Sequence, residues 1–177
     1  MTLSKIAIAA ALLFAAGTAL AQGTGPTDPQ IAAIVVTANQ VDIDAGRLGE
    51  AKAHAKDVKA FAQQMVKDHT AVNKSAVDLV QKLKVTPEES DTSKSLKKGG
   101  DENLANLKKL QGAEFDRAYV DHEVAYHQAV IDALDKTLIP NAKNAELKAL
   151  LEKSRPAFVA HLEHAKHIQA SLGKKAG

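Results

Sequence analysis

Apolar residues recur every three or four positions along four long stretches of the chain, which is the spacing of one buried face on an α-helix. These stretches predict helices over about 28–52, 57–83, 113–138 and 143–172. Thr27 or Asp28 can cap the first helix, with Pro29 in its first turn, and Pro156 predicts a kink inside the fourth. No stretch shows the alternating pattern of a half-buried strand, so we expect an all-α fold.

The stretch between the second and third of these helices is polar. Residues 84–101 contain a capping signature at 86–89 and the pair Gly99–Gly100, so we expect a long crossover with at most one helical turn inside it. A short helix over 104–110 should follow and end at Gly112. Two helical hairpins joined by one long crossover form a ferritin-like four-helix bundle, which we expect over 28–172, before a tail at 173–177. An up-down-up-down bundle is the alternative if the crossover is itself a short helix.

The N-terminus has the pattern of a secretory signal peptide over residues 1–21. Lys5 precedes an apolar run over 6–20, and Ala19-Leu20-Ala21 matches the small residues that signal peptidase reads. An uncleaved membrane anchor is the alternative, but the run is short for a membrane span. We expect cleavage before Gln22, a disordered lead over 22–27 and a periplasmic location. No later stretch has the composition of a transmembrane segment.

Charge and composition narrow the classes of function. The 177 residues include 23 Lys and Arg and 21 Asp and Glu, a net charge of +2, whereas a nucleic-acid-binding protein usually shows a clustered basic excess. Cysteine is absent, which excludes disulfides, thiolate nucleophiles and cysteine-based metal sites. The sequence also contains no phosphate-binding loop, nucleotide fingerprint or nucleophile–base pair. We therefore expect no nucleic-acid partner, and an enzymatic role is not favoured.

Ionisable side chains interrupt the apolar faces of all four predicted helices, at positions that the helical period turns inward. They are Asp42 on the first helix, His69 on the second, Asp116, Glu123 and His127 on the third, and His161 on the fourth. A buried ionisable group is costly unless it is paired or coordinates an ion. The set therefore predicts a metal site or a buried polar network, with Asp68 either orienting the neighbouring His69 or lying on the surface.

The heights of these residues along the bundle can be compared within each hairpin. If the first hairpin turns near residue 55, Asp42 lies 13 residues before the turn and His69 lies 14 after it, at nearly equal height. If the second turns near residue 140, the position opposite His161 is about 119 or 120. That position is closer to Asp116 and Glu123 than to His127.

Three classes of function remain open. The first is a metal-binding bundle that uses the inward histidines, and the second is a structural or stress-associated interaction domain whose polar network fixes helix register. The third is a di-metal oxidase, but the chain has no Glu-x-x-His motif, and its closest approach is Glu123-x-x-x-His127. These two residues could also form a simple intrahelical pair. A set rich in histidine favours one zinc, copper or nickel ion over a bridged pair of iron ions.

Three segments in order resemble domain-of-unknown-function family 4142. They are Phe61-Ala-Gln-Gln-Met-Val-Lys-Asp-His69, Gly112-Ala-Glu-Phe-Asp-Arg-Ala-Tyr-Val120 with His127 following, and His161-Leu-Glu-His-Ala165. The resemblance covers about 28–172 and implies an exported bacterial protein with a ferritin-like helical fold. It implies no activity, because none is established for the family. The family usually has Glu where this chain has Asp42, and the shorter side chain reduces the reach of any bridging carboxylate.

Overall fold

The computed structural model describes residues 25–174, and within this range the regular backbone structure is helical. The helices are α1 (Asp28–Lys52), α2 (Lys56–Leu83), α3 (Asp91–Lys109), α4 (Gly112–Ala133) and α6 (Ala145–Lys174), with a π-helix η1 (Leu134–Leu138) and a short α5 (Ile139–Asn141) between the last two. The predicted signal peptide at 1–21 and most of the predicted lead at 22–27 lie outside the described residues.

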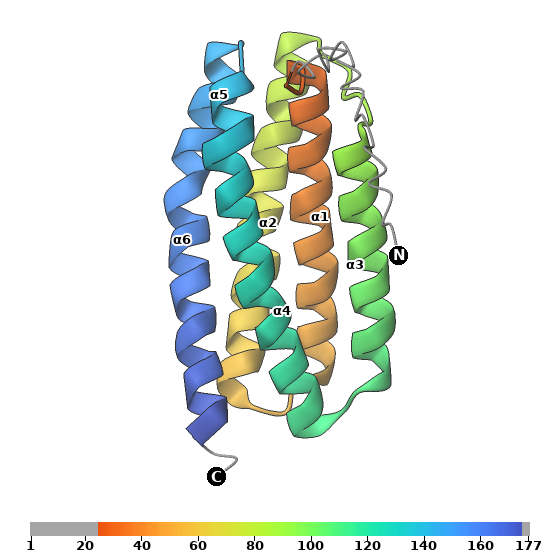
Figure 1. Ribbon diagram of the computed structural model, residues 1–177, viewed down its shortest axis with the longest axis vertical. Helices are drawn as coiled ribbons and strands as arrows, with labels where there is room; N and C mark the ends of the chain where they lie inside the picture. Colours follow the sequence, from red (N-terminus) through yellow and green to blue (C-terminus); the bar gives the residue numbers. More distant parts are fainter. Residues whose placement is uncertain (1–24, 175–177) are drawn as a thin grey trace, which may run out of the picture.

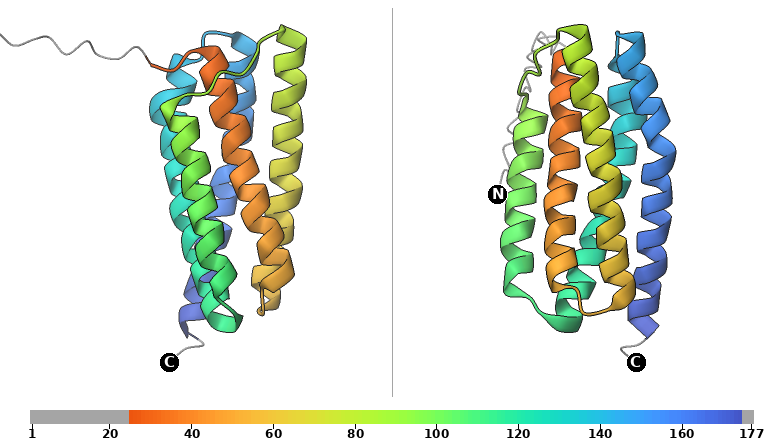
Figure 2. Two further views of the ribbon diagram at one scale, coloured as in Figure 1. Left: turned by 90° about the vertical axis from the view of Figure 1, so that its right-hand side faces the viewer. Right: turned by 180° about the vertical axis from the view of Figure 1, so that it is seen from behind.

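Helices α1, α2, α4 and α6 form the bundle, as antiparallel pairs α1–α2 and α4–α6 (Figure 1). Helix α3 runs along the outside of α1 and carries the chain from the end of α2 back to the opposite end of the bundle, where α4 begins (Figure 2). This is the connectivity of two hairpins joined by a long crossover. The predicted all-α, ferritin-like class is therefore confirmed.

The crossover is more helical than its sequence predicted. Ser90 begins α3 with a capping box, in which its side chain accepts from the Ser93 amide and the Ser93 hydroxyl accepts from the Ser90 amide. The predicted short helix over 104–110 coincides with the last third of this 19-residue element and its C-cap, Leu110. Because α3 covers only one side of the bundle, a narrow stripe with Gly100 and Leu107 is enough to pack it, and the rest of its surface is polar.

Two aspartates on α1 and α4 each hold the turn of the other hairpin. Asp28 in α1 accepts hydrogen bonds at 2.8 Å from the backbone amides of Lys143 and Asn144, at the turn before α6. Asp116 in α4 accepts from the amides of His54 and Ala55, at 2.9 and 2.7 Å, at the turn before α2. Each carboxylate thus binds the turn just before a helix N-terminus, where negative charge is stabilising. Together they fix the two hairpins against each other at both ends of the bundle.

The turn of the second hairpin lies at 142–144, later than the predicted position near 140, because η1 and α5 continue the helical path to Asn141. Asn144 then caps α6 by accepting from the amides of Glu146 and Leu147. Helix α6 continues through Pro156 over 30 residues as one element. The later turn changes which residues of α4 and α6 face each other.

The buried apolar side chains form two clusters along the bundle. The upper cluster, at the end where α1 begins in Figure 1, contains Ile31, Ile34, Val35, Ala76, Ile131, Leu134, Leu138, Ala142, Leu147, Leu151, Phe158 and Leu162. The lower cluster contains Ala45, Val58, Phe61, Ala62, Met65, Leu107, Phe115, Tyr119, Val120, Ala165 and Ile168. Inward polar residues, among them His69 and His127, lie between the two clusters.

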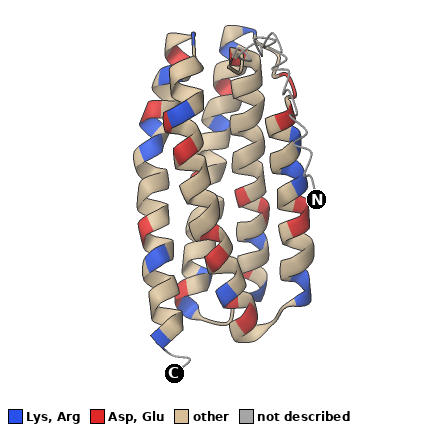
Figure 3. Cartoon of the chain, viewed as in Figure 1, with Lys and Arg blue, Asp and Glu red and all other residues tan. Residues whose placement is uncertain are grey.

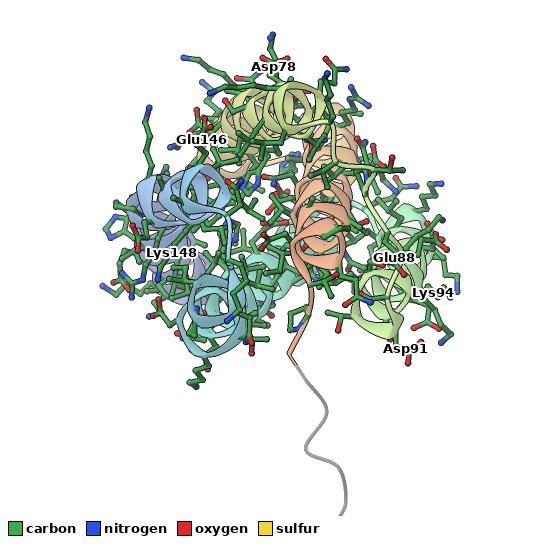
Figure 4. All side chains as sticks on the ribbon, turned by 90° about the horizontal axis from the view of Figure 1, so that it is seen from above. Asp78, Glu88, Asp91, Lys94, Glu146 and Lys148 are labelled. Carbon is green, nitrogen blue, oxygen red and sulfur yellow. The ribbon has the colours of Figure 1, made fainter. Side chains whose placement is uncertain are left out.

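The outer surface carries both signs of charge. Lys, Arg, Asp and Glu are interspersed along the helices (Figure 3), and labelled examples such as Asp78 and Lys94 lie at the outer margin of the bundle in the axial view (Figure 4). Several form exposed pairs one turn apart, such as Lys97 with Asp101, which contribute little to stability. Among the helices of residues 25–174, none combines the length and apolar character that a membrane crossing requires.

Replacing each of the two adjacent glycines of α3 with alanine should have opposite effects on the stability of the protein. A Cβ atom on Gly100 would lie 2.7 Å from Val41 Cγ2, whereas a Cβ atom on Gly99 would meet nothing within 4 Å. We expect Gly100→Ala to lower the free energy of unfolding by about 1–2 kcal/mol through overpacking. Gly99→Ala should raise it by about 0.5–1 kcal/mol, because alanine loses less backbone freedom on entering a helix. Urea denaturation of both variants checks the pair, and equal effects would contradict the close packing of α3 on α1.

Candidate metal centre

Five ionisable side chains from the four bundle helices meet between the two apolar clusters. They are Asp42 of α1, His69 of α2, Glu123 and His127 of α4, and His161 of α6, and each is at most 3% exposed. All five were predicted from their inward positions. These five residues form one polar layer of the bundle. An apolar interior cannot solvate ionisable groups, so the chemistry of this layer depends on the contacts that the five groups make with one another.

The three imidazoles lie next to one another. Their ring centroids are 5.5 Å apart for His69 and His127, 5.3 Å for His69 and His161, and 5.4 Å for His127 and His161. One ring nitrogen from each of the three lies within 4.8 Å of one from each of the others. Phe158 stacks on His69 with an interplanar angle of 9° and closes one side of the group.

Hydrogen bonds on the outer side of each ring select its tautomer. His69 Nδ1 donates to Asn39 Oδ1 at 2.9 Å, and the Asn39 amide nitrogen is itself held by donating to the Val35 carbonyl. His127 Nδ1 donates to the Glu123 carbonyl at 3.0 Å, and His161 Nε2 donates to Asp68 Oδ2 at 3.0 Å. A neutral imidazole has one N–H, so each bond leaves a lone pair on the second nitrogen.

The nitrogens that carry these lone pairs are His69 Nε2, His127 Nε2 and His161 Nδ1. All three are buried and have no hydrogen-bond partner among the described residues. Histidines that bind metals typically donate their other ring N–H to a carboxylate, a backbone carbonyl or water. The arrangement of these three rings matches that pattern: the outer nitrogens donate and the inner nitrogens are free.

Asp42 completes the group from α1. Its Oδ2 atom lies 3.3 Å from His69 Nε2 and 3.5 Å from His127 Nε2, and neither carboxyl oxygen has a hydrogen-bond partner among residues 25–174. Burial raises the pKa of the Asp42 carboxyl to about 8. Without a bound cation, Asp42 is therefore protonated at neutral pH.

Burial also keeps the histidines neutral. It lowers the pKa of His127 to about 4 and the pKa of His69 well below its ordinary value, and the neighbouring histidines lower both further. Burial lowers the pKa of His161 as well, although its bond to Asp68 acts in the opposite direction. The contacts of His69 and His127 with Asp42 are thus not ion pairs, and the layer holds neutral nitrogen donors around a carboxyl group.

Glu123 forms a second possible set of ligands with Asp42 and His127. One ligand atom from each of these three residues lies within 4.8 Å of the others, and Glu123 Oε2 is 3.5 Å from His127 Nδ1. Burial raises the pKa of Glu123 well above its ordinary value, and the nearby Asp42 raises it further. This set shares Asp42 and His127 with the first, so the two sets form one continuous polar layer.

The structure does not bring Asp116 into this layer. Both of its carboxylate oxygens accept backbone hydrogen bonds at the start of α2, as described above, and it belongs to neither set of potential ligands. Its inward position therefore serves to hold the turn before α2, and it lies outside the proposed metal centre. Asp68 lies beside His69 in the sequence but orients His161 of α6 instead.

The later turn of the second hairpin explains why His161 meets His127. With the turn centred at 143, the position opposite His161 is about residue 125, not 119 or 120. In the first hairpin, the predicted match of Asp42 with His69 agrees with their 3.3 Å contact. Sequence reasoning missed Asn39, although its place three residues before Asp42 puts it on the same helix face.

Comparison with known proteins identifies the family. The family model named "Domain of unknown function (DUF4142)" matches residues 13–168. No curated protein matches the sequence. Among solved structures, CopM in its Cu(II)-bound form is similar to this chain with a TM-score of 0.66 and 18% identity, over 83% of this chain and 98% of that one. A DUF305 protein from Streptomyces coelicolor is similar with a TM-score of 0.67 and 11% identity, over 81% and 92%. These two likenesses concern the fold, and the match of the family model shows that the chain belongs to the DUF4142 family.

Proposed function

We propose that this protein binds one divalent transition-metal ion, copper(II) in preference to zinc, through His69, His127 and His161, with Asp42 as a fourth ligand. One observation carries the proposal: three adjoining imidazoles are each held in the tautomer that leaves a buried, unpartnered nitrogen. Imidazole suits copper, zinc, nickel and iron, and a site of nitrogen and oxygen donors generally binds copper(II) most tightly of the divalent first-row ions.

The distances leave room for an ion after a small contraction. Nitrogens held about 2.1 Å from an ion in a tetrahedral site are about 3.4 Å from one another. One ring nitrogen from each histidine lies within 4.8 Å of one from each of the others, so a contraction of roughly 1 Å brings three nitrogens to that spacing. Asp42 would lose its proton on binding, because a carboxylate must be ionised to act as a ligand.

A polar network without metal is the second candidate, and the protonated Asp42 supports it. Its hydroxyl can donate a hydrogen bond to only one imidazole nitrogen at a time, so it cannot satisfy all three within the protein. Each buried acceptor left without a partner costs about 1–3 kcal/mol. A metal ion satisfies all three nitrogens together. The set of Asp42, Glu123 and His127 supports a di-metal oxidase as a third candidate, for which two bound ions would be the sign.

Two further observations bear on copper and on location. A solved structure with a similar fold holds Cu(II), which makes copper the first ion to test.

Residues 1–21 have the pattern of a signal peptide, and we propose that the protein is exported and binds its ion in the periplasm. Mass spectrometry of the exported protein should find Gln22 at its N-terminus.

His69→Ala should abolish stoichiometric copper binding. The wild type should bind one Cu(II), measured by calorimetry and metal analysis, and at a free copper concentration 100 times Kd gain about 2.7 kcal/mol of stability. That gain corresponds to a rise in Tm of roughly 5–10 °C. The variant should lose the copper-dependent rise in Tm.

Two variants serve as controls. His167→Ala removes an exposed histidine of the same helix as His161 and should bind copper as the wild type does. Asp116→Asn should lower Tm equally with copper and with chelator, because Asp116 holds the turn before α2 through two backbone hydrogen bonds. If His69→Ala lowers stability by the same amount with and without chelator, and the wild type binds no copper, the polar network is the better account.

Asp68→Asn should weaken copper binding by about 10- to 100-fold without touching a ligand. An asparagine amide can donate to His161 Nε2, which would move the ring proton to Nδ1 and remove the lone pair that faces the ion. Asp78→Asn, on the exposed face of the same helix, is the matched control. An unchanged Kd for Asp68→Asn would contradict the proposed role of the Asp68 carboxylate in orienting His161.

The stability of the metal-free protein should fall as the pH rises from 6.5 to 8.5. Folding raises the pKa of Asp42 from 3.8 to about 8, so the folded protein holds a proton that the unfolded chain has released. This contribution to stability is complete below about pH 4 and is lost as the pH rises through about 8, with a slope of up to about 1.4 kcal/mol per pH unit.

The lowered pKa of His127 has the opposite effect: it makes stability rise with pH, but only between about pH 4 and 6.5. In that interval the unfolded chain binds a proton at this residue and the folded protein does not. The decline above pH 6.5 is therefore due to the buried carboxyls. Asp42→Asn should reduce the slope of this decline in the free energy of unfolding with pH, as measured by urea denaturation in the presence of chelator. A wild-type protein whose stability rises over this pH interval would contradict the assignment of a protonated Asp42.

A further inference from the structure

A cavity of about 480 Å³ lies in the upper half of the bundle and reaches the proposed metal centre. Asn39, Asp42, His69 and His127 line its inner end. Gly25 and Pro26 before α1, with Ser90 and Thr92 at the start of α3, line its outer end, where side chains are partly or fully exposed. Figure 4 looks down the bundle from this end. The cavity thus connects the surface with the buried histidines.

The cavity is too large to be a packing defect. Protein interiors contain few voids larger than a water molecule, and pockets that hold small molecules usually measure about 300–1,000 Å³. The lower cluster is filled by Phe61, Phe115 and Tyr119, each 0% exposed, whereas alanines such as Ala38 and Ala133 line the upper cavity. Leu134 and Leu138 of the π-helix η1 form part of its wall, and π-helical turns are frequent at functional sites.

The lining is polar at the inner end and apolar along most of the walls. The unpartnered atoms at the inner end are both oxygens of Asp42 and the Nε2 atoms of His69 and His127. The walls carry aliphatic side chains and Phe158, and no Lys or Arg is among the described residues that line the cavity. A molecule that fits must therefore have an apolar body and a single polar group that lies next to the histidines.

From this cavity we infer that the protein binds an aliphatic carboxylate, with the alkyl chain in the cavity and the carboxylate on the metal ion. The inference rests on the proposed metal site, because the described lining offers no cationic side chain to meet the carboxylate. Burial of the alkyl chain supplies about 0.8 kcal/mol for each methylene. The carboxylate would be a fifth ligand beside Asp42, because the cavity is lined by Asp42, His69 and His127 and not by His161.

Decanoate titrated into the copper-loaded protein tests the inference. Decanoate should shift the visible absorption band of bound Cu(II) in a saturable manner, and butanoate, with the same carboxylate but little apolar body, should require at least a 100-fold higher concentration. Ala133→Phe fills the cavity from its wall and should weaken decanoate binding at least tenfold, with one Cu(II) still bound. Ala125→Phe, on the exposed face of the same helix, should bind decanoate like the wild type.

The outcomes separate the two proposals. A protein that binds no copper overturns the proposed function, as seen in the metal analysis before any decanoate is added. A protein that binds one copper ion but shows no shift with decanoate, or an equal shift with butanoate, overturns the carboxylate inference alone. Equal affinity of Ala133→Phe and the wild type for decanoate would also overturn the carboxylate inference alone. Tighter binding of decylamine to the metal-free protein than of decanoate to the copper form also overturns it, since the preferred polar group would then be a cation paired with Asp42.

Discussion

The burial of five ionisable groups in one layer of the bundle is the constraint on which the other features of this structure depend. Apolar side chains tolerate small shifts of one helix along another, because hydrocarbon packs against hydrocarbon in many ways. The polar layer does not tolerate such shifts, because a shift of one helical turn, about 5.4 Å, would place each of its groups against aliphatic side chains. Its members are Asp42, His69, Glu123, His127 and His161. All four bundle helices contribute to the layer, so it specifies the register of the whole bundle.

Other parts of the fold hold that register and make the layer accessible. Asp28 and Asp116 connect each hairpin to the turn of the other, at opposite ends of the bundle, and so set the relative heights of the helices that carry the histidines. Below the layer the core is filled by aromatic side chains, and above it a cavity remains. A buried group of nitrogen donors with one open side differs from a structural metal site, which surrounds its ion completely.

Much of the fold and part of the centre were evident from the order of residues alone. The four bundle helices follow from apolar spacing, because each of them has to bury one face, and the inward histidines interrupt that spacing. The match of Asp42 with His69 was also predictable, because a short turn of three residues allows heights to be counted from it with little error. The sequence thus determined the helices, the candidate ligands and the pairing within the first hairpin.

The tertiary structure decided the features that depend on residues far apart in the chain. Asp116 and Asp68 have partners 61 and 93 residues away. No local pattern could therefore show that Asp116 holds the turn before α2 and is not a ligand, or that Asp68 orients His161. The π-helix η1 and α5 displaced the second turn, and with it the partner of His161, because local spacing does not reveal where a helical path will end. Only the later part of α3 was expected as a helix, over 104–110. The residues before it were expected to form a crossover, because α3 packs on one side only and its few buried positions leave a mostly polar sequence. The cavity, too, belongs to the assembled bundle, because empty volume arises only where side chains from several helices fail to meet.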